Sequence, residues 1–136
     1  MDIENIQNQI NRIEKSIAIL QRKIADESIV ENRINNKIQF SNMSMRRSKS
    51  ANFINGIQND ILKHQNDIFR CKSKIADFQQ QIANKTEELG RKKQELLKVE
   101  KTQKLEQIEL QNNLKIDIEK QKEKLDFLIN MTYVLS

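Results

Sequence analysis

Few residues of this chain could bind a metal or act as nucleophiles. His64 and Cys71 are its single histidine and its single cysteine. On one helix their separation of seven residues amounts to roughly 10 Å, which is too far for both to ligate one zinc ion. A metal would therefore need ligands from several chains. We favour the alternative, in which His64 sets the register of a helical interface and Cys71 is a small buried thiol, and we expect no metal and no cofactor.

The patterns that support catalysis are missing as well. No pair of carboxylates stands out from the acids expected on a helix surface, and the sequence holds neither a glycine-rich phosphate loop nor a nucleophile elbow. We therefore expect a protein that is not an enzyme.

The composition indicates which kind of secondary structure carries His64 and Cys71. The 136 residues include no proline and two glycines, and aromatic residues make up 4%. Tight turns and large rings, which a globular core normally needs, are therefore scarce. Hydrophobic residues still amount to 37%, and they recur at regular intervals. This combination predicts long helices that each bury a narrow stripe.

Charge and processing signals indicate the compartment. The net charge is +5, but 24 basic residues are interleaved with 19 acidic ones, as on a solvated helix face, so the excess is only a weak hint of an anionic partner. A single cysteine fits a reducing compartment. The start of the chain lacks the apolar region of a signal peptide, and no stretch approaches the roughly 18 apolar residues of a membrane span. We expect a cytoplasmic protein with no membrane span.

The first forty residues carry an apolar series whose intervals alternate between three and four. This is the heptad spacing that keeps one seam of a helix facing a partner, and isoleucine at both core positions of parallel coils favours trimers or tetramers over dimers. The series predicts a first coiled-coil helix over 1–40. Its seam consists of Ile3, Ile6, Ile10, Ile13, Ile17, Leu20 and Ile24.

The seam then meets two acids, Glu27 and Glu31, before it resumes at Ile34 and Ile38. A serine- and arginine-rich segment follows, and because serine and asparagine favour caps and turns, it predicts a hinge over 41–52. Either Ser50 or Asn52 is expected to cap the next helix.

A second seam predicts a longer helix over 53–136. Gly90 leaves open whether this helix is continuous or kinked, because a glycine in a helix interior costs about 1 kcal/mol relative to alanine. Farther on, the seam becomes polar and then re-forms from Leu110. The clearest seam residues are Ile54, Ile57, Ile61, Ile68, Ile75, Phe78 and Ile82.

The two helices share a short sequence. QRKIAD at 21–26 returns as KSKIAD at 72–77, an offset of 51 residues. Shared seam positions account for the isoleucines, whereas the matching Asp26 and Asp77 lie off the seam. Either a duplicated helix or biased composition explains the match, since internal repeats become persuasive at about three copies.

Two surfaces are candidates for binding. The C-terminal segment is apolar on more than one helix face and is too short to span a bilayer, so it either caps a bundle or docks on a partner. Its candidate docking residues are Phe127, Leu128, Met131, Tyr133 and Leu135.

The basic cluster Arg46, Arg47 and Lys49 could contact phosphate, but no aromatic residue is interleaved for base stacking, so we favour an exposed hinge.

Residues 44–89 carry a further resemblance. A serine-rich lead runs into INGIQNDI, then SKIAD at 73–77 and QIANKTEEL at 81–89. This stretch resembles the coiled-coil segments that precede effector domains, such as TIR domains, in bacterial signalling and phage-defence proteins. We expect no effector domain after Leu89. The resemblance therefore implies an assembly or sensing subunit whose effector is encoded separately.

Together these observations predict an all-α protein of long coiled-coil helices, arranged as a helical hairpin or bundle and assembled as an oligomer. The expected function is a non-catalytic scaffold that binds further copies of itself, a separately encoded protein, or both. Two alternatives remain: an accessory protein that binds nucleic acid through the basic cluster, and an antitoxin-like inhibitor of a partner protein.

Overall fold

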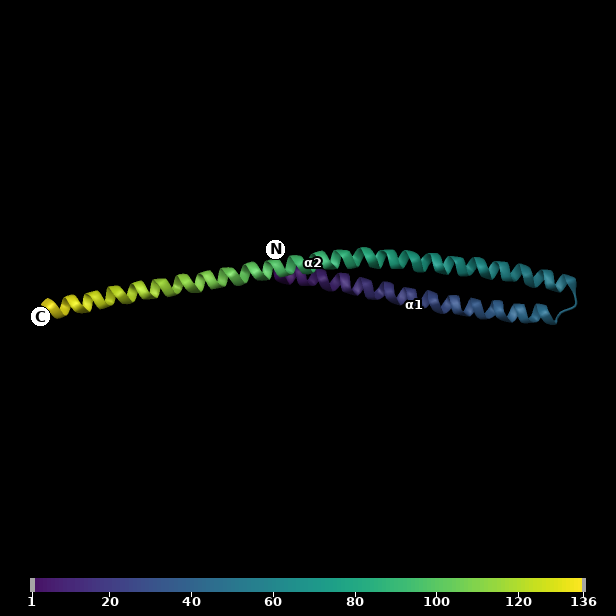
Figure 1. The fold of residues 1–136 in the computed structure, drawn as a ribbon, viewed down its shortest axis with the longest axis horizontal. Coiled ribbons are helices and arrows are strands. Elements are labelled where there is room, and N and C mark those ends of the chain that lie inside the picture. Colours follow the sequence, from purple (N-terminus) through teal and green to yellow (C-terminus); the bar gives the residue numbers. More distant parts are fainter. Residues whose placement is uncertain (1, 136) are drawn as a thin grey trace.

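A computed structural model describes residues 2–135 of the chain as two helices, α1 (Ile3–Arg47) and α2 (Ala51–Leu135). The helices run side by side in opposite directions, and α2 continues far past the start of α1 (Figure 1). The predicted all-α class is confirmed. The outermost residues of the predicted ranges, Met1 and Ser136, lie outside the described part of the chain.

The ends of α1 follow from local chemistry. Asp2 is the N-cap, and its side chain accepts a hydrogen bond of 3.3 Å from the backbone N–H of Glu4. Glu4 lies in the first turn and Arg46 and Arg47 lie in the last, so each charge complements the helix dipole at its end. The backbone of Ser48 is extended, and the helix stops there.

The connection between the helices is shorter than the predicted hinge at 41–52. Only residues 48–50 separate α1 from α2, and the range 41–47 is helical. Ser41 and Met45 extend the heptad spacing of α1 and are half-buried. Packing against α2 thus outweighs the preference of serine and asparagine for turns.

Ser50 caps α2. Its hydroxyl accepts a hydrogen bond of 3.4 Å from the N–H of Phe53, and its own N–H donates to the hydroxyl of Ser48 at 3.2 Å. Of the two residues that the sequence allows as the N-cap of this helix, the structure therefore selects Ser50 and not Asn52.

Removing this cap should weaken the hairpin at its turn. Ser50→Ala is expected to lower the free energy of unfolding by about 1 kcal/mol, because it exposes an unpaired N–H of the first turn. Thermal unfolding followed by circular dichroism measures the change. Asn52→Ala is the matched control, and an equal loss in both variants would contradict the assignment of the cap.

The core of the hairpin is a single line of side chains between the helices. Ile6 is fully buried, and Ile10, Ile13, Leu20 and Cys71 are nearly so. The remaining seam residues from Ile3 to Ile82 are half-buried, whereas Leu110, where the sequence pattern resumes, is exposed. The structure thus places the sequence-predicted seam residues between α1 and α2 of one chain. Their role as an oligomer interface stays a prediction.

Gly90 does not interrupt α2, which is helical from Ala51 to Leu135. Leu89 and Lys92 on either side are half-buried against α1, and this packing offsets the helix-breaking tendency of glycine. An added Cβ at Gly90 would meet no atom within 4 Å, so this position faces open space.

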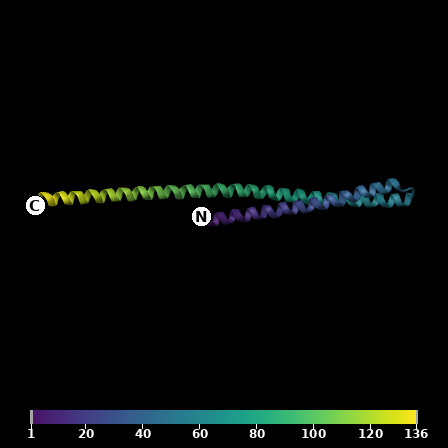
Figure 2. The same ribbon diagram turned by 90° about the horizontal axis from the view of Figure 1, so that it is seen from below.

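Beyond Val99 every described residue of α2 is exposed. We call residues 100–135 the overhang. It extends for roughly 54 Å at 1.5 Å per residue, and both ribbon views show it running on as a lone helix past the N-terminus (Figures 1 and 2). Across residues 2–135, neither helix has an apolar stretch long enough to cross a membrane.

Candidate partner-binding surfaces

The acidic interruption of the first seam lies opposite a basic part of α2. The Glu27 carboxylate lies 3.6 Å from the Lys74 ammonium, and the Glu31 carboxylate lies 3.9 Å from that of Lys72. Both lysines are largely exposed. Exposed ion pairs of this kind contribute little stability, but their signs favour this register of α1 against α2.

Cys71 lies within this polar part of the interface and is 6% exposed. Burial raises the pKa of its thiol above the ordinary value, and a hydrogen bond with Glu27 and the charge of that carboxylate raise the pKa further. The thiol is therefore held in its neutral form. This agrees with the expected small buried thiol and not with a reactive thiolate.

The raised pKa of Cys71 predicts how the stability of the hairpin depends on pH. The folded-state pKa of Cys71 is raised, so its contribution to stability is complete below the unfolded value of about 8.5 and is lost as pH rises through the folded value. Unfolding of the native chain should become easier above that pH, and Cys71→Ala should remove this part of the dependence. Denaturant titrations between pH 7 and 10 test both statements.

A second measurement uses alkylation rates. At pH 8 Cys71 should react with iodoacetamide at least tenfold more slowly than an exposed cysteine, because thiolate is the reactive form. Ser73→Cys in the Cys71→Ala background supplies the exposed control. Equal rates would show that the thiol is not protected.

His64 is half-buried on the same line of side chains, one heptad before Cys71. Within residues 2–135 no group of three or more histidine, cysteine, aspartate or glutamate side chains is placed to hold a metal ion.

The basic cluster lies at the tip of the hairpin. Arg46 and Arg47 are exposed in the last turn of α1, and Lys49 is exposed in the connection. The turn that carries these three residues therefore lies at one end of the molecule, opposite to the overhang (Figure 1).

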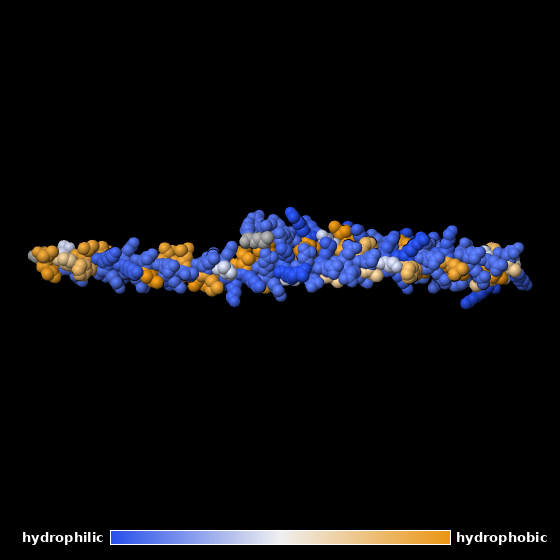
Figure 3. Space-filling view, turned by 90° about the horizontal axis from the view of Figure 1, so that it is seen from above, coloured by the Kyte–Doolittle hydropathy of each residue, from blue (hydrophilic) through white to orange (hydrophobic). Residues whose placement is uncertain are grey.

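The overhang exposes the proposed docking residues. The exposed fraction is 63% at Phe127, 59% at Leu128 and 45% at Met131, and it exceeds 80% at Tyr133 and Leu135. Shallow hollows form between these side chains, one lined by Lys120, Lys124 and Phe127. Figure 3 shows apolar residues gathered at this end and recurring in patches along the overhang. Every described residue of the segment from Leu125 to Leu135 is exposed in this structure.

A second apolar line on α2 escaped the sequence analysis. Each of its residues directly follows a seam residue, so it is rotated by about 100° around the helix from the face that packs on α1. Every seventh residue from 62 to 97 is apolar or small and exposed. We call this line the outer stripe. It consists of Leu62, Phe69, Ala76, Ala83, Gly90 and Leu97.

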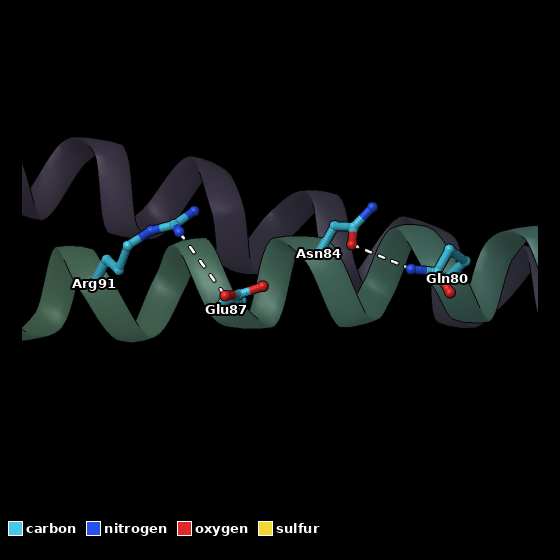
Figure 4. Close-up of polar contacts among 4 residues, drawn as sticks. All are labelled: Gln80, Asn84, Glu87 and Arg91. Atoms are coloured by element: carbon cyan, nitrogen blue, oxygen red, sulfur yellow. Dashed lines mark hydrogen bonds and ion pairs between the residues drawn. The ribbon is translucent and has the colours of Figure 1, made fainter.

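The positions beside the outer stripe change character along its length. Three and four residues after Leu62, Phe69 and Ala76, five of the six side chains are neutral amides or hydroxyls, whereas four of the six after Ala83, Gly90 and Leu97 are charged. Beside the second half Glu87 pairs with Arg91 at 3.9 Å, while beside the first half Gln80 donates a hydrogen bond to Asn84 (Figure 4). A solvated helix face is normally charged, whereas protein interfaces are depleted of charge, so the first half of the stripe has the more interface-like surroundings.

The exposed apolar residues of α1 provide a contrast. Ile19 and Phe40 share one heptad position and Ile29 and Met43 share another, but the positions between them hold Asp26, Arg33 and Asn36, so neither pair forms a continuous apolar line. Scattered exposure of this kind is ordinary on a protein surface. The outer stripe was missed because three of its six members are alanine or glycine, which a search for large side chains passes over. A tally by heptad position would have found it.

The fold and these surfaces define a two-helix hairpin whose second helix runs on alone. No protein-family model, curated protein or solved structure matches the chain.

Proposed function

We propose that this protein is a non-catalytic helical scaffold, in which the hairpin is a coiled-coil body and the overhang of α2 is the part that assembles with other helices. The proposal rests chiefly on the overhang, a helical segment with large apolar side chains that nothing in the described chain covers. Apolar surface of this extent marks an interaction site.

The hairpin itself supports assembly. Two helices leave most seam residues only half-buried, and among residues 2–135 five apolar side chains are close to fully buried. Further helices would complete the burial of such a seam. The scaffold acts in the cytoplasm, whose reducing environment suits a lone thiol.

The first experiment measures self-association and partner binding. Mass photometry or sedimentation at micromolar concentration should show oligomers of the full chain, and a chain ending at Lys124 should associate more weakly while its helix content per residue stays unchanged. A stable helical monomer of the full chain that binds no other protein would contradict the scaffold. A truncated chain that unfolds would show that 125–136 belongs to the core.

The resemblance of residues 44–89 favours a particular setting, an assembly or sensing subunit of a bacterial defence or signalling complex. In that setting the overhang receives the separately encoded effector. An antitoxin-like inhibitor would use the same apolar segment, and it differs in that binding silences the partner's activity.

The basic cluster favours a second candidate function, an accessory protein that binds nucleic acid. Arg46, Arg47 and Lys49 are all exposed at the hairpin tip. Phosphate binding by three cations should weaken steeply with salt, and changing all three to glutamine should abolish it. Fluorescence anisotropy with labelled DNA and RNA at 50 and 200 mM salt tests this, and unchanged binding by the triple variant would exclude the cluster.

A further inference from the structure

We infer that the occupant of the outer stripe and of the overhang is a second copy of this chain, aligned parallel and in register along α2. This inference rests on the proposed scaffold function and specifies which face assembles and in which direction. The interface lies on the outer side of α2, away from the seam that joins α2 to α1.

The first argument is continuity between the two surfaces. Counting on from Leu97 in steps of seven leads through Lys104 and Gln111 to Ile118 and Leu125, two exposed apolar residues of the overhang. Leu114, Leu128 and Leu135 each lie three residues after a position of this series, and they are also exposed. Apart from the interruption at Lys104 and Gln111, the outer stripe and the apolar line of the overhang therefore form one heptad line from Leu62 to Leu125, which lies on a single face when α2 supercoils around a partner.

The second argument is that parallel pairing covers the whole of this face. An in-register copy places the hairpin part against the hairpin part and the overhang against the overhang. An antiparallel copy centred on the outer stripe would match Leu62 with Leu97 and Phe69 with Gly90, but it would carry Leu125 beyond the tip of the other hairpin. The most exposed apolar residues would then stay in water.

The third argument concerns charge. Beside Leu62, Phe69 and Ala76 five of the six flanking residues are neutral amides or hydroxyls, which can both donate and accept, so this part of two identical faces can meet without repulsion. In the overhang, Asp117 and Lys122 flank the apolar line and are five residues apart. This is the spacing at which opposite charges on two parallel helices face each other. Lys104 interrupts the line, and a single lysine in such a position fixes register and helix number at some cost in stability.

The geometry also leaves room for the second copy. Two of the five charged groups next to the stripe pair with α1: Lys72 lies 3.9 Å from Glu31 and Lys93 lies 3.8 Å from Glu14. Small residues at Ala76, Ala83 and Gly90 allow two helices to approach closely, and an added Cβ at Gly90 would meet nothing within this chain.

The test places one charge on the stripe. Ala83→Glu introduces a carboxylate that would face its own copy in the dimer, and Ala25→Glu makes the same change on an exposed position of α1. Sedimentation should show a dimer for the native chain and for Ala25→Glu, and a dissociation constant raised at least tenfold for Ala83→Glu. Both variants should keep the native melting temperature when measured as monomers at high dilution.

Cysteine crosslinking tests the direction. In a Cys71→Ala background, Leu125→Cys should form a disulfide between identical positions on mild oxidation. Mixing Leu62→Cys protein with Leu97→Cys protein should give no mixed disulfide, because in parallel alignment these positions lie roughly 50 Å apart. A mixed 62–97 disulfide would overturn the parallel alignment.

The outcomes separate this inference from the proposed function. If Ala83→Glu dimerises as tightly as the native chain, the stripe is not the interface, although the scaffold still self-assembles. If the native chain remains monomeric but binds a different protein through the overhang, the second copy is excluded and the scaffold stands. If it neither self-associates nor binds a partner, both fail.

Discussion

Replacing Ile6 with alanine should destabilise the hairpin by about 3 kcal/mol, the range measured for large-to-small changes in protein cores. Among the described residues, Ile6 is the one side chain that is fully buried, and its exposed fraction is 0%. Its loss removes apolar contacts and leaves a cavity between α1 and α2. Because the core is a single line of side chains, few neighbours can shift to fill the space.

The matched control is Ile19→Ala. Ile19 belongs to the same helix but is 56% exposed, so the same chemical change should cost well under 1 kcal/mol. Denaturant unfolding followed by circular dichroism measures both at a fixed protein concentration. Similar losses in the two variants would mean that α1 packs through a different face.

Replacing Glu27 with isoleucine should stabilise the hairpin by about 1–2 kcal/mol, since it restores an apolar residue to the seam at the cost of an ion pair. The Glu27 side chain is 21% exposed, and its partner Lys74 is 62% exposed. An ion pair in contact with water contributes little, whereas a seam isoleucine packs against α2. The pKa of Cys71 should fall toward its ordinary value, because the hydrogen bond and the negative charge of Glu27, which both raise it, are lost with the carboxylate.

Glu14→Ile is the control for this gain. Glu14 also pairs with a lysine of α2, at 3.8 Å from the Lys93 ammonium, but it lies beside the seam and its side chain is 50% exposed. Its replacement removes a comparable ion pair and adds no buried surface of similar size. The melting temperature should therefore rise only for Glu27→Ile. A rise for both variants would show that the gain in stability does not come from burying the isoleucine in the seam.

The sequence predicts the helices well because their pattern is simple. Alternating steps of three and four from Ile3 to Ile24 define one face of a helix, and the structure buries four residues of that face most deeply. The cap at Ser50 was one of two candidates, and local hydrogen-bonding chemistry was enough to suggest it.

The extent of the connection could not be predicted, because it depends on contacts made far away in the sequence. Ser41 and Met45 are poor evidence for a helix by themselves, and they become helical because α2 lies beside them. The helix that covers the first seam could not be predicted either. A heptad pattern specifies that a face is covered, but α2 of the same chain and a helix of another chain satisfy it equally.

The unbroken course of α2 sets a distance. Its 85 residues at 1.5 Å each separate the basic tip of the hairpin from the apolar end of the overhang by roughly 128 Å. No turn lies between them to absorb a change in length. Whatever binds at the two ends is therefore held at a fixed spacing, and inserting one heptad into the overhang would lengthen that spacing by about 10 Å while preserving the face that each end presents.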